Sequence, residues 1–124
     1  MRSRIMTEAV SVIALMAIMG GTAWAQAPIE PTDPDILYTG RWVHSNPTQP
    51  WCYWMGSSII VNFEGSSCSA TMSAGWSSNQ DYLRVIVDGD AANSTKISVW
   101  PSTSTYLLAS GLDDGVHKLE IIKE

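Results

Sequence analysis

Hydrophobic and polar residues alternate in short runs along most of the chain, while helical periodicity is almost absent. Seven runs combine β-branched or aromatic residues with this alternation, which is the pattern of half-buried β-strands. They span residues 37–42, 58–63, 68–72, 82–87, 96–100, 105–109 and 116–123. Their spacing of roughly 8 to 12 residues predicts an all-β sandwich of about seven to eight antiparallel strands.

The same alternation assigns side chains to the core. In the run 82–87, Leu83, Val85 and Val87 share one face, opposite Tyr82 and Arg84. Alternate residues of a strand point to opposite sides of its sheet, so we assign the first set to the core. By the same rule, further core positions are Ile59, Val61, Phe63, Leu119 and Ile121.

Glycine and aspartate residues lie between the predicted strands. Residues 64–67 (Glu-Gly-Ser-Ser) predict a hairpin between two runs, with Gly65 supplying a positive φ. Residues 88–90 and 113–115 have similar turn chemistry. No repeat of fixed period is visible, which argues against a propeller or solenoid.

The N-terminus has the composition of a signal peptide. Arg2 and Arg4 precede an apolar run at 9–19, and the small residues of 23–25 suit a signal peptidase. The run is short for a membrane anchor, which needs about 20 apolar residues. We therefore expect cleavage after Ala25, a secreted or periplasmic protein, and residues 1–25 outside the fold.

Residues 26–35 hold three prolines and three acidic residues, which is typical of an extended leader. Residues 36–124 are then long enough for one domain. Without residues 1–25 the chain keeps 5 basic and 11 acidic side chains, a net charge of −6. Nucleic-acid binding requires basic side chains that neutralise phosphates, so this charge excludes that class.

The two cysteines, Cys52 and Cys68, would both be exported, and an oxidising compartment favours a disulfide between them. Two buried thiols are the alternative, because sequence does not show whether the pair comes within bridging distance. His44 and His117 lack the spacing of zinc ligands. Calcium could use the aspartates of the turns, but turn formation explains them more simply. We therefore expect no metal and no cofactor.

Five tryptophans follow residue 25, and they are the main candidates for function. Indole rings stack on the apolar faces of sugars, but they also pack well in cores. Trp42 and Trp100 lie at the ends of predicted strands, where packing is favoured. The candidate carbohydrate contacts are Trp51, Tyr53, Trp54, Trp76 and His44.

His44, Trp51 and Tyr53 lie together in a proline-containing stretch, residues 44–53, that predicts a rigid aromatic loop. Trp54 follows it directly, but it belongs to a Trp-Met-Gly-Ser motif and has the stronger claim to a structural role. Trp76 comes from a separate loop, residues 73–81. The sequence thus offers two aromatic loops as possible sugar contacts.

A search for catalytic residues is mostly negative. A serine hydrolase needs an activated serine, a histidine base and oxyanion donors. No Gly-x-Ser-x-Gly elbow is present. His117 begins a predicted strand, where a structural hydrogen bond is the simpler role. The chain alone is therefore not expected to be an enzyme.

A set of short motifs resembles one known family. They are Tyr38-Thr39-Gly40-Arg41-Trp42, Trp54-Met55-Gly56-Ser57, Phe63-Glu64-Gly65, Val87-Asp88-Gly89, Gly111-Leu112 and His117-Lys118-Leu119. In order and spacing they resemble the N-terminal jelly-roll domain of family 2 carbohydrate esterases, such as acetyl xylan esterases. The resemblance implies a jelly-roll fold for residues 36–124.

In that family the jelly roll precedes an SGNH hydrolase domain that removes acetyl groups from plant polysaccharides. The resemblance implies a nucleophile in a Gly-Asp-Ser motif of that domain, whereas the nearest match here is Gly89-Asp90-Ala91. We therefore expect a non-catalytic module that binds a polysaccharide of xylan or glucomannan type or packs on a hydrolase domain. The alternatives are part of a deacetylase that is active only with that domain, or an unrelated adhesive β-sandwich.

A module that normally packs on a hydrolase domain should carry an exposed apolar patch. We expect such a patch on the surface of the sandwich, including Ile122 and Leu107.

Overall fold

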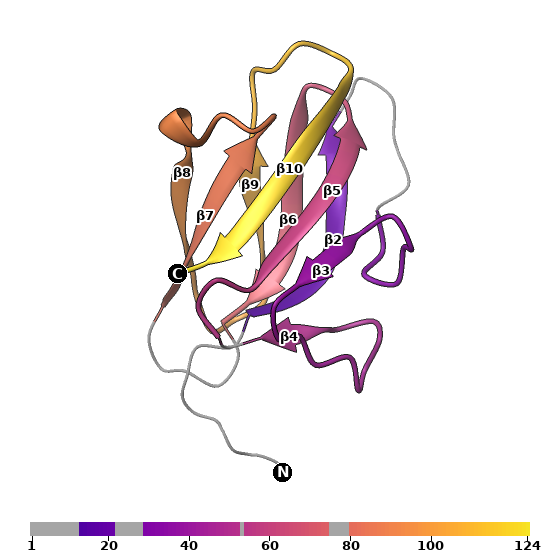
Figure 1. The fold of residues 1–124 in the computed structure, drawn as a ribbon, viewed down its shortest axis with the longest axis vertical. Coiled ribbons are helices and arrows are strands. Elements are labelled where there is room, and N and C mark those ends of the chain that lie inside the picture. Colours follow the sequence, from indigo (N-terminus) through magenta and orange to yellow (C-terminus); the bar gives the residue numbers. More distant parts are fainter. Residues whose placement is uncertain (1–12, 22–28, 53, 75–79) are drawn as a thin grey trace.

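The computed structural model describes residues 13–21, 29–52, 54–74 and 80–124. They form two antiparallel sheets stacked face to face (Figure 1). The five-stranded sheet has the order β3-β5-β10-β7-β8, and the four-stranded sheet has the order β4-β2-β6-β9. The strands are β2 (Ile13–Gly21), β3 (Leu37–Thr39), β4 (Trp51–Cys52), β5 (Ser58–Glu64), β6 (Ser67–Ser73), β7 (Asp81–Val87), β8 (Thr95–Val99), β9 (Ser104–Ala109) and β10 (Val116–Lys123).

The predicted all-β jelly-roll sandwich is confirmed, and each of the seven runs forms a strand. The clearest difference in length is β3, which ends at Thr39 instead of residue 42. Gly40 follows with a φ of 87°, which turns the chain out of the sheet. The described residues contain no helix long and apolar enough to cross a membrane.

The core lies between the sheets and follows the predicted alternation. β10 runs between β5 and β7, so Leu119 is opposite both Val61 and Val87. Two residues further on, Ile121 is opposite Ile59 and Val85. All of these except Val87 are almost completely buried, and Val87 packs against the cluster. Each large apolar side chain buried in this way contributes about 1.5–3 kcal/mol.

The hairpin predicted at residues 64–67 is wrong. β5 and β6, which this turn connects, belong to different sheets. Phe63 and Cys68 on either side of the turn both face the core. The chain therefore crosses from one sheet to the other, and Gly65 N–H donates to the carbonyl of Gly115 at 2.8 Å.

The N-terminal apolar run differs from the expectation that residues 1–25 lie outside the fold. Ile13–Gly21 forms β2, between β4 and β6, and the Ile18 side chain is completely buried. A short apolar run suits a buried central strand as well as a signal peptide, and pattern alone does not separate them. Cleavage after Ala25 stays a prediction.

The predicted Cys52–Cys68 disulfide is also wrong, since both cysteines are unpaired and buried. β2 separates them: Cys52 is opposite Ile13 and Cys68 is opposite Gly20. Seven residues along a strand span roughly 20 Å, whereas bridged cysteines have Cα atoms at most about 7 Å apart. Burial raises the pKa of each thiol to about 12, and for Cys52 nearby Lys123 opposes this effect.

Candidate functional site

The loops after β3 and before β5 meet at one end of the sandwich because Gly40 allows close approach. A Cβ atom at Gly40 would lie 2.8 Å from both Cα and Oγ of Ser57. With no side chain in the way, Arg41 N–H donates to Ser57 Oγ at 3.3 Å. Two of the motifs that carry the family resemblance are therefore neighbours in space.

Trp42 holds the same junction together. Its Nε1 donates to the carbonyls of Thr39 at 3.0 Å and Ser58 at 3.2 Å. Its ring packs edge-on against Tyr38 and, partly buried, against the core. The packing role predicted for Trp42 is confirmed.

Arg41 and Trp54 form the exposed part of this end. The Arg41 guanidinium lies over the Trp54 ring, 4.9 Å from its centroid, and Trp54 is 50% exposed. A hollow of about 410 Å³ adjoins this pair on the side of Met55 and Gly56. We call Arg41, Trp42, Trp51 and Trp54 the aromatic end.

A second hollow, of about 200 Å³, is lined by all four residues of the aromatic end together with Val43. Arg41 and Trp54 line both hollows, so the stacked pair forms a ridge between them. Sugar rings offer apolar faces to an indole and hydroxyl groups to a guanidinium. The aromatic end combines both features.

The structure brings some predicted site residues together and separates others. Trp51, on β4, lies in the second hollow with Trp54. His44 is exposed but packs edge-on against Tyr38, with ring centroids 4.8 Å apart. Tyr53 and Trp76 lie outside the described residues.

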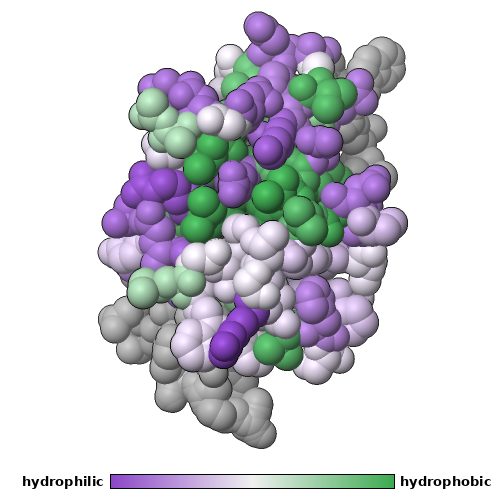
Figure 2. Space-filling view, in the orientation of Figure 1, coloured by the Kyte–Doolittle hydropathy of each residue, from purple (hydrophilic) through white to green (hydrophobic). Residues whose placement is uncertain are grey.

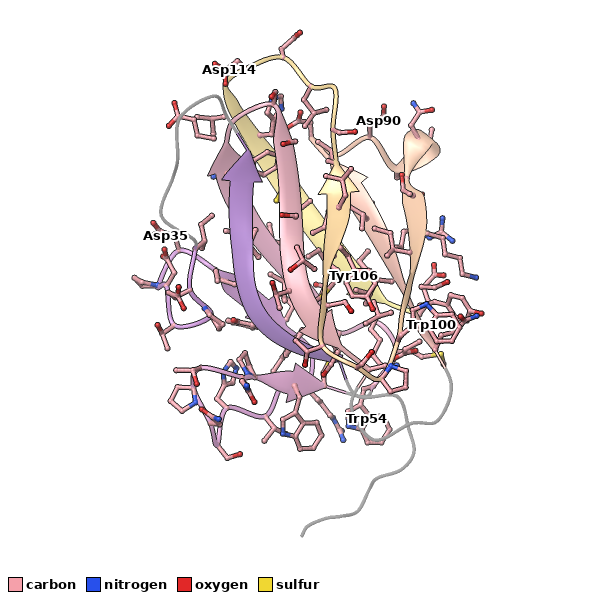
Figure 3. All side chains as sticks on the ribbon, turned by 180° about the vertical axis from the view of Figure 1, so that it is seen from behind. Asp35, Trp54, Asp90, Trp100, Tyr106 and Asp114 are labelled. Atoms are coloured by element: carbon pink, nitrogen blue, oxygen red, sulfur yellow. The ribbon has the colours of Figure 1, made fainter. Side chains whose placement is uncertain are left out.

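Two residues change the ranking of candidates made from sequence. Trp100 was expected to pack but is 53% exposed. It follows β8, and Figure 3 shows it, like Trp54, away from the end that holds Asp90 and Asp114. Arg41 was not a candidate at all, although it occupies the middle of a motif between a required glycine and an anchored tryptophan.

A buried ion pair lies beneath the aromatic end. Lys123 Nζ is 3.1 Å from Asp81 Oδ2, and both side chains are almost fully buried. Asp81 Oδ1 accepts the Tyr82 N–H at 3.0 Å, while no well-aligned hydrogen bond to Oδ2 exists within the described part of the chain. The Lys123 N–H donates to the carbonyl of Ser57, the residue that Gly40 approaches closely. The ion pair therefore lies next to the contact between Gly40 and Ser57.

The opposite end of the sandwich carries what we call the acidic turn: Asp88, Asp113 and His117. His117 Nδ1 lies 2.6 Å from Asp88 Oδ2, and its Nε2 lies 2.6 Å from the Asp113 carbonyl oxygen. These two acceptors raise the pKa of His117, the Asp113 carbonyl most strongly. Asp88 also accepts the Lys118 N–H at 2.9 Å, and its pKa is lowered, chiefly by His117.

The hydrogen bonds of the acidic turn therefore stabilise the fold and do not form a catalytic triad. A histidine–aspartate pair is part of a serine hydrolase triad, but there the second ring nitrogen faces a serine. Here that nitrogen faces a backbone carbonyl, and the structural hydrogen bond predicted for His117 is confirmed. Among the described residues no group of three or more His, Cys, Asp or Glu side chains is placed to hold a metal ion.

A cleft of about 350 Å³ opens beside the acidic turn. Asp88, Asp90 and Asn93 contribute its polar wall, and Val87 and Leu112 part of its apolar wall. None of the described residues that line it is aromatic, in contrast to those of the aromatic end.

A third surface is the outer face of the five-stranded sheet. Hydrophobic residues gather there over β5, β7 and β10 (Figure 2). Leu37 is opposite Ile60, and Glu120 of β10 lies between Ile60 and Ile86 in the same row. Ile122, two residues further along β10, is opposite Ser58 and Arg84. Leu37 is 56% exposed and the three isoleucines are half-buried. We call these four residues the outer apolar patch.

The predicted apolar patch is therefore present, and Ile122 belongs to it. Leu107 does not: it is exposed on β9, in the other sheet.

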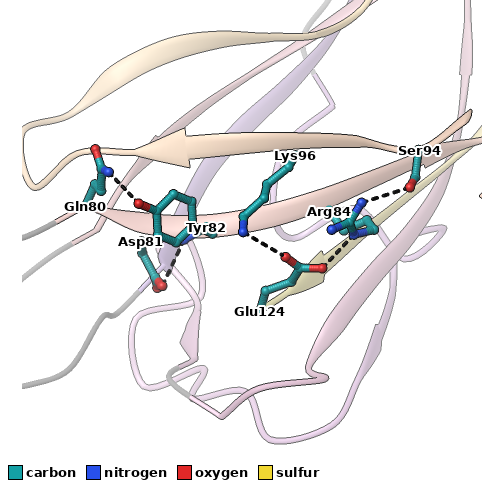
Figure 4. Close-up of polar contacts among 7 residues, drawn as sticks. All are labelled: Gln80, Asp81, Tyr82, Arg84, Ser94, Lys96 and Glu124. Atoms are coloured by element: carbon teal, nitrogen blue, oxygen red, sulfur yellow. Dashed lines mark hydrogen bonds and ion pairs between the residues drawn. The ribbon is translucent and has the colours of Figure 1, made fainter.

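Charged residues gather near the C-terminal end of β10 (Figure 4), and one of them, Arg84, is opposite Ile122 of the outer apolar patch. Glu124 accepts from Arg84 Nε at 2.6 Å and lies 3.8 Å from Lys96 Nζ. Arg84 also donates to Ser94 Oγ, and Lys96 lies over the Tyr82 ring. Apart from Glu120, the apolar residues of this face thus have polar neighbours around them, and an apolar centre with a polar rim is the usual anatomy of a protein interface.

Comparison with known proteins points to one family. The family model described as carbohydrate esterase 2 N-terminal matches residues 38–124. The cellulase/esterase CelE of Acetivibrio thermocellus is 39% identical over 99 residues, covering 80% of this chain and 11% of CelE.

Solved structures agree with this match. An active site mutant of a family two carbohydrate esterase from Clostridium thermocellum is 41% identical, with a TM-score of 0.63 over 73% of this chain and 26% of that chain. A structure of a family two esterase from the same organism in complex with cellohexaose is 40% identical, with a TM-score of 0.62 over 71% and 26%. The Cellvibrio japonicus esterase is 26% identical, with a TM-score of 0.66 over 77% and 27%. The chain thus spans about a tenth of CelE and about a quarter of each solved chain.

Proposed function

The chain belongs to the carbohydrate esterase 2 N-terminal family, and from this premise we propose that it is a non-catalytic accessory domain that binds polysaccharide through its aromatic end. The observation that supports this proposal most directly is the exposed Trp54 ring, which lies beneath the Arg41 guanidinium and lines two hollows. The cellohexaose complex of a relative gives independent support for a β-linked sugar polymer as the ligand class.

The geometry suits such a ligand for a physical reason. An aromatic ring stacks on a sugar at little cost in side-chain entropy, and a guanidinium offers five N–H donors to hydroxyl groups. The hollows on both sides of the ridge can receive the neighbouring sugars of a chain. Xylan and glucomannan are the polymers we propose, which also requires the domain to be secreted or periplasmic.

Affinity electrophoresis on xylan, glucomannan and soluble cellulose derivatives tests this proposal. We expect Trp54→Ala to weaken retardation by about tenfold, since stacking contributes roughly 1 kcal/mol or more. Trp100→Ala is the matched control because Trp100 is equally exposed but lines neither hollow. Absence of retardation on every polymer, or equal losses in the two variants, would show that the aromatic end is not the binding site.

A second candidate function is docking on a hydrolase domain through the outer apolar patch. The relatives are several times longer than this chain, and Glu124 lies at the border of the patch. In this alternative the chain is part of a polysaccharide deacetylase that acts only when the SGNH domain is supplied.

Sedimentation of the chain mixed with the SGNH domain of a family relative tests docking. We expect Ile60→Lys to abolish association because it replaces one of the four apolar side chains of the patch with a charged one, next to Leu37. Leu107→Lys, on the opposite sheet, should leave association intact. If the wild-type chain does not associate, or both variants behave alike, the patch is not the docking surface.

A further inference from the structure

The position between β4 and β6 is unusual because the N-terminal apolar segment occupies it. Among the strands of the described residues, β2 is the only one that pairs with β4. On its other edge β2 pairs with β6 from Ala14 opposite Ser73 to Gly21 opposite Ser67. Ile18 also exchanges two backbone hydrogen bonds with Ile29, at 3.0 and 2.6 Å.

The segment Ile13–Gly21 contributes to the core as well as to the sheet. Ile18 is completely buried, in the same cluster as Ala70, Met72 and Leu108. Without β2, this cluster would lose one of its largest fully buried side chains. The N–H and C=O groups of β6 that now face β2 would also lose their partners, and open sheet edges of this kind capture other strands.

The composition of Ile13–Gly21 fits the position. The segment reads Ile-Ala-Leu-Met-Ala-Ile-Met-Gly-Gly and carries no charge or proline. A strand between two others needs an uninterrupted set of N–H donors, which a proline would break. The segment meets this requirement.

We propose that the position between β4 and β6 is a strand-acceptor site whose occupant is the chain's own segment Ile13–Gly21. The segment with the composition of a signal peptide is therefore a structural part of the folded domain. A chain that loses it would expose the edge of β6, and open edges of this kind are templates for pairing with another strand. This inference is an alternative to the predicted cleavage after Ala25, which would remove the segment, and it does not depend on the polysaccharide binding proposed above.

Hydrogen exchange on the full chain, produced in the cytoplasm where signal peptidase does not act, gives the first test. We expect amides of residues 13–21 to be protected to the same degree as those of β6, since the two strands share one hydrogen-bond ladder. Exchange of residues 13–21 at the rate of an unstructured peptide, with β6 still protected, would overturn the proposal.

Two substitutions distinguish a buried role of Ile18 from the effect of adding a charge anywhere on this sheet. Ile18→Asp places a carboxylate in the core and should lower the melting temperature by about 10 °C or more. Leu107→Asp, at an exposed position of the same sheet, should change it by about 2 °C or less. Equal shifts would contradict a structural role for Ile18.

If Ile18→Asp does not fold, proteolytic cleavage of the full chain provides another test. A protease site introduced between Gly21 and Ile29 allows the folded protein to be cleaved after purification. We expect the N-terminal fragment to stay bound through size-exclusion chromatography and to leave only in denaturant. If it separates freely while the melting temperature is unchanged, residues 13–21 are not the occupant.

Discussion

The aromatic end and the acidic turn lie at opposite ends of the same sandwich, and they use their polar groups differently. At the acidic turn, His117 directs both ring nitrogens and Asp88 both carboxylate oxygens to neighbouring parts of the chain. At the aromatic end, Arg41 and Trp54 contact each other but remain exposed beside two hollows. Polar groups used internally stabilise a loop, whereas exposed ones can bind a ligand.

The largest expected effect comes from the ion pair behind the aromatic end. Lys123→Met leaves the Asp81 carboxylate buried without a cation, so we expect the free energy of unfolding to fall by about 3–5 kcal/mol. Urea denaturation measures the loss. Lys118→Met on the same strand is exposed and should change stability by about 0.5 kcal/mol or less. Similar losses would mean that Lys123 and Asp81 do not act as a pair.

Next in size is a pair of glycine substitutions, one at each end. Gly40→Ala combines a positive φ with a Cβ atom 2.8 Å from Ser57, and we expect a loss of about 3 kcal/mol. Gly89→Ala also has a positive φ but meets open space, so about 1 kcal/mol should be lost. Both values come from urea denaturation. If the two losses are equal, close approach at Gly40 is not what shapes the aromatic end.

The acidic turn should respond to pH. The pKa of His117 is raised by folding, so its stabilisation is complete below the unfolded value near 6.5 and is lost as pH rises through the folded pKa. The pKa of Asp88 is lowered, so its contribution is present above about pH 4 and is lost as pH falls through the folded pKa. Urea midpoints between pH 5 and 9 should fall with pH in the wild type and be flatter in His117→Gln. An unchanged slope in the variant would place the titrating group elsewhere.

The smallest effect concerns the two thiols, Cys52 on β4 and Cys68 on β6. With each pKa near 12, only about one thiol in ten thousand is ionised at pH 8, and both are buried. Ellman's reagent should therefore label neither cysteine in the folded protein and both in urea. A protein that shows no thiol in urea without reductant would instead contain the disulfide.

The strands of the five-stranded sheet could be predicted because alternation reports burial on one face. Ile59, Leu83 and Leu119 were assigned to the core from spacing alone, and all are buried. The four-stranded sheet was harder to predict. β4 has only two residues and no measurable period, and the apolar run of β2 fits a signal peptide equally well.

The candidate site was predicted only in part, because exposure of a tryptophan depends on tertiary packing. Trp42 and Trp100 are both the last residues of predicted strands, yet one donates to two carbonyls and the other is half exposed. The disulfide failed for a related reason. Sequence separation between Cys52 and Cys68 does not reveal that another strand lies between them.

Glu124 is held at a fixed point on the surface of the sandwich. Its carboxylate is held by Arg84 and Lys96, and its N–H donates to the Tyr82 carbonyl at 3.0 Å. A following segment would leave from an anchored point at the rim of the outer apolar patch instead of from a loose tether. The effective concentration of an attached partner at the patch would then be high, so even a weak contact surface could be occupied nearly all the time.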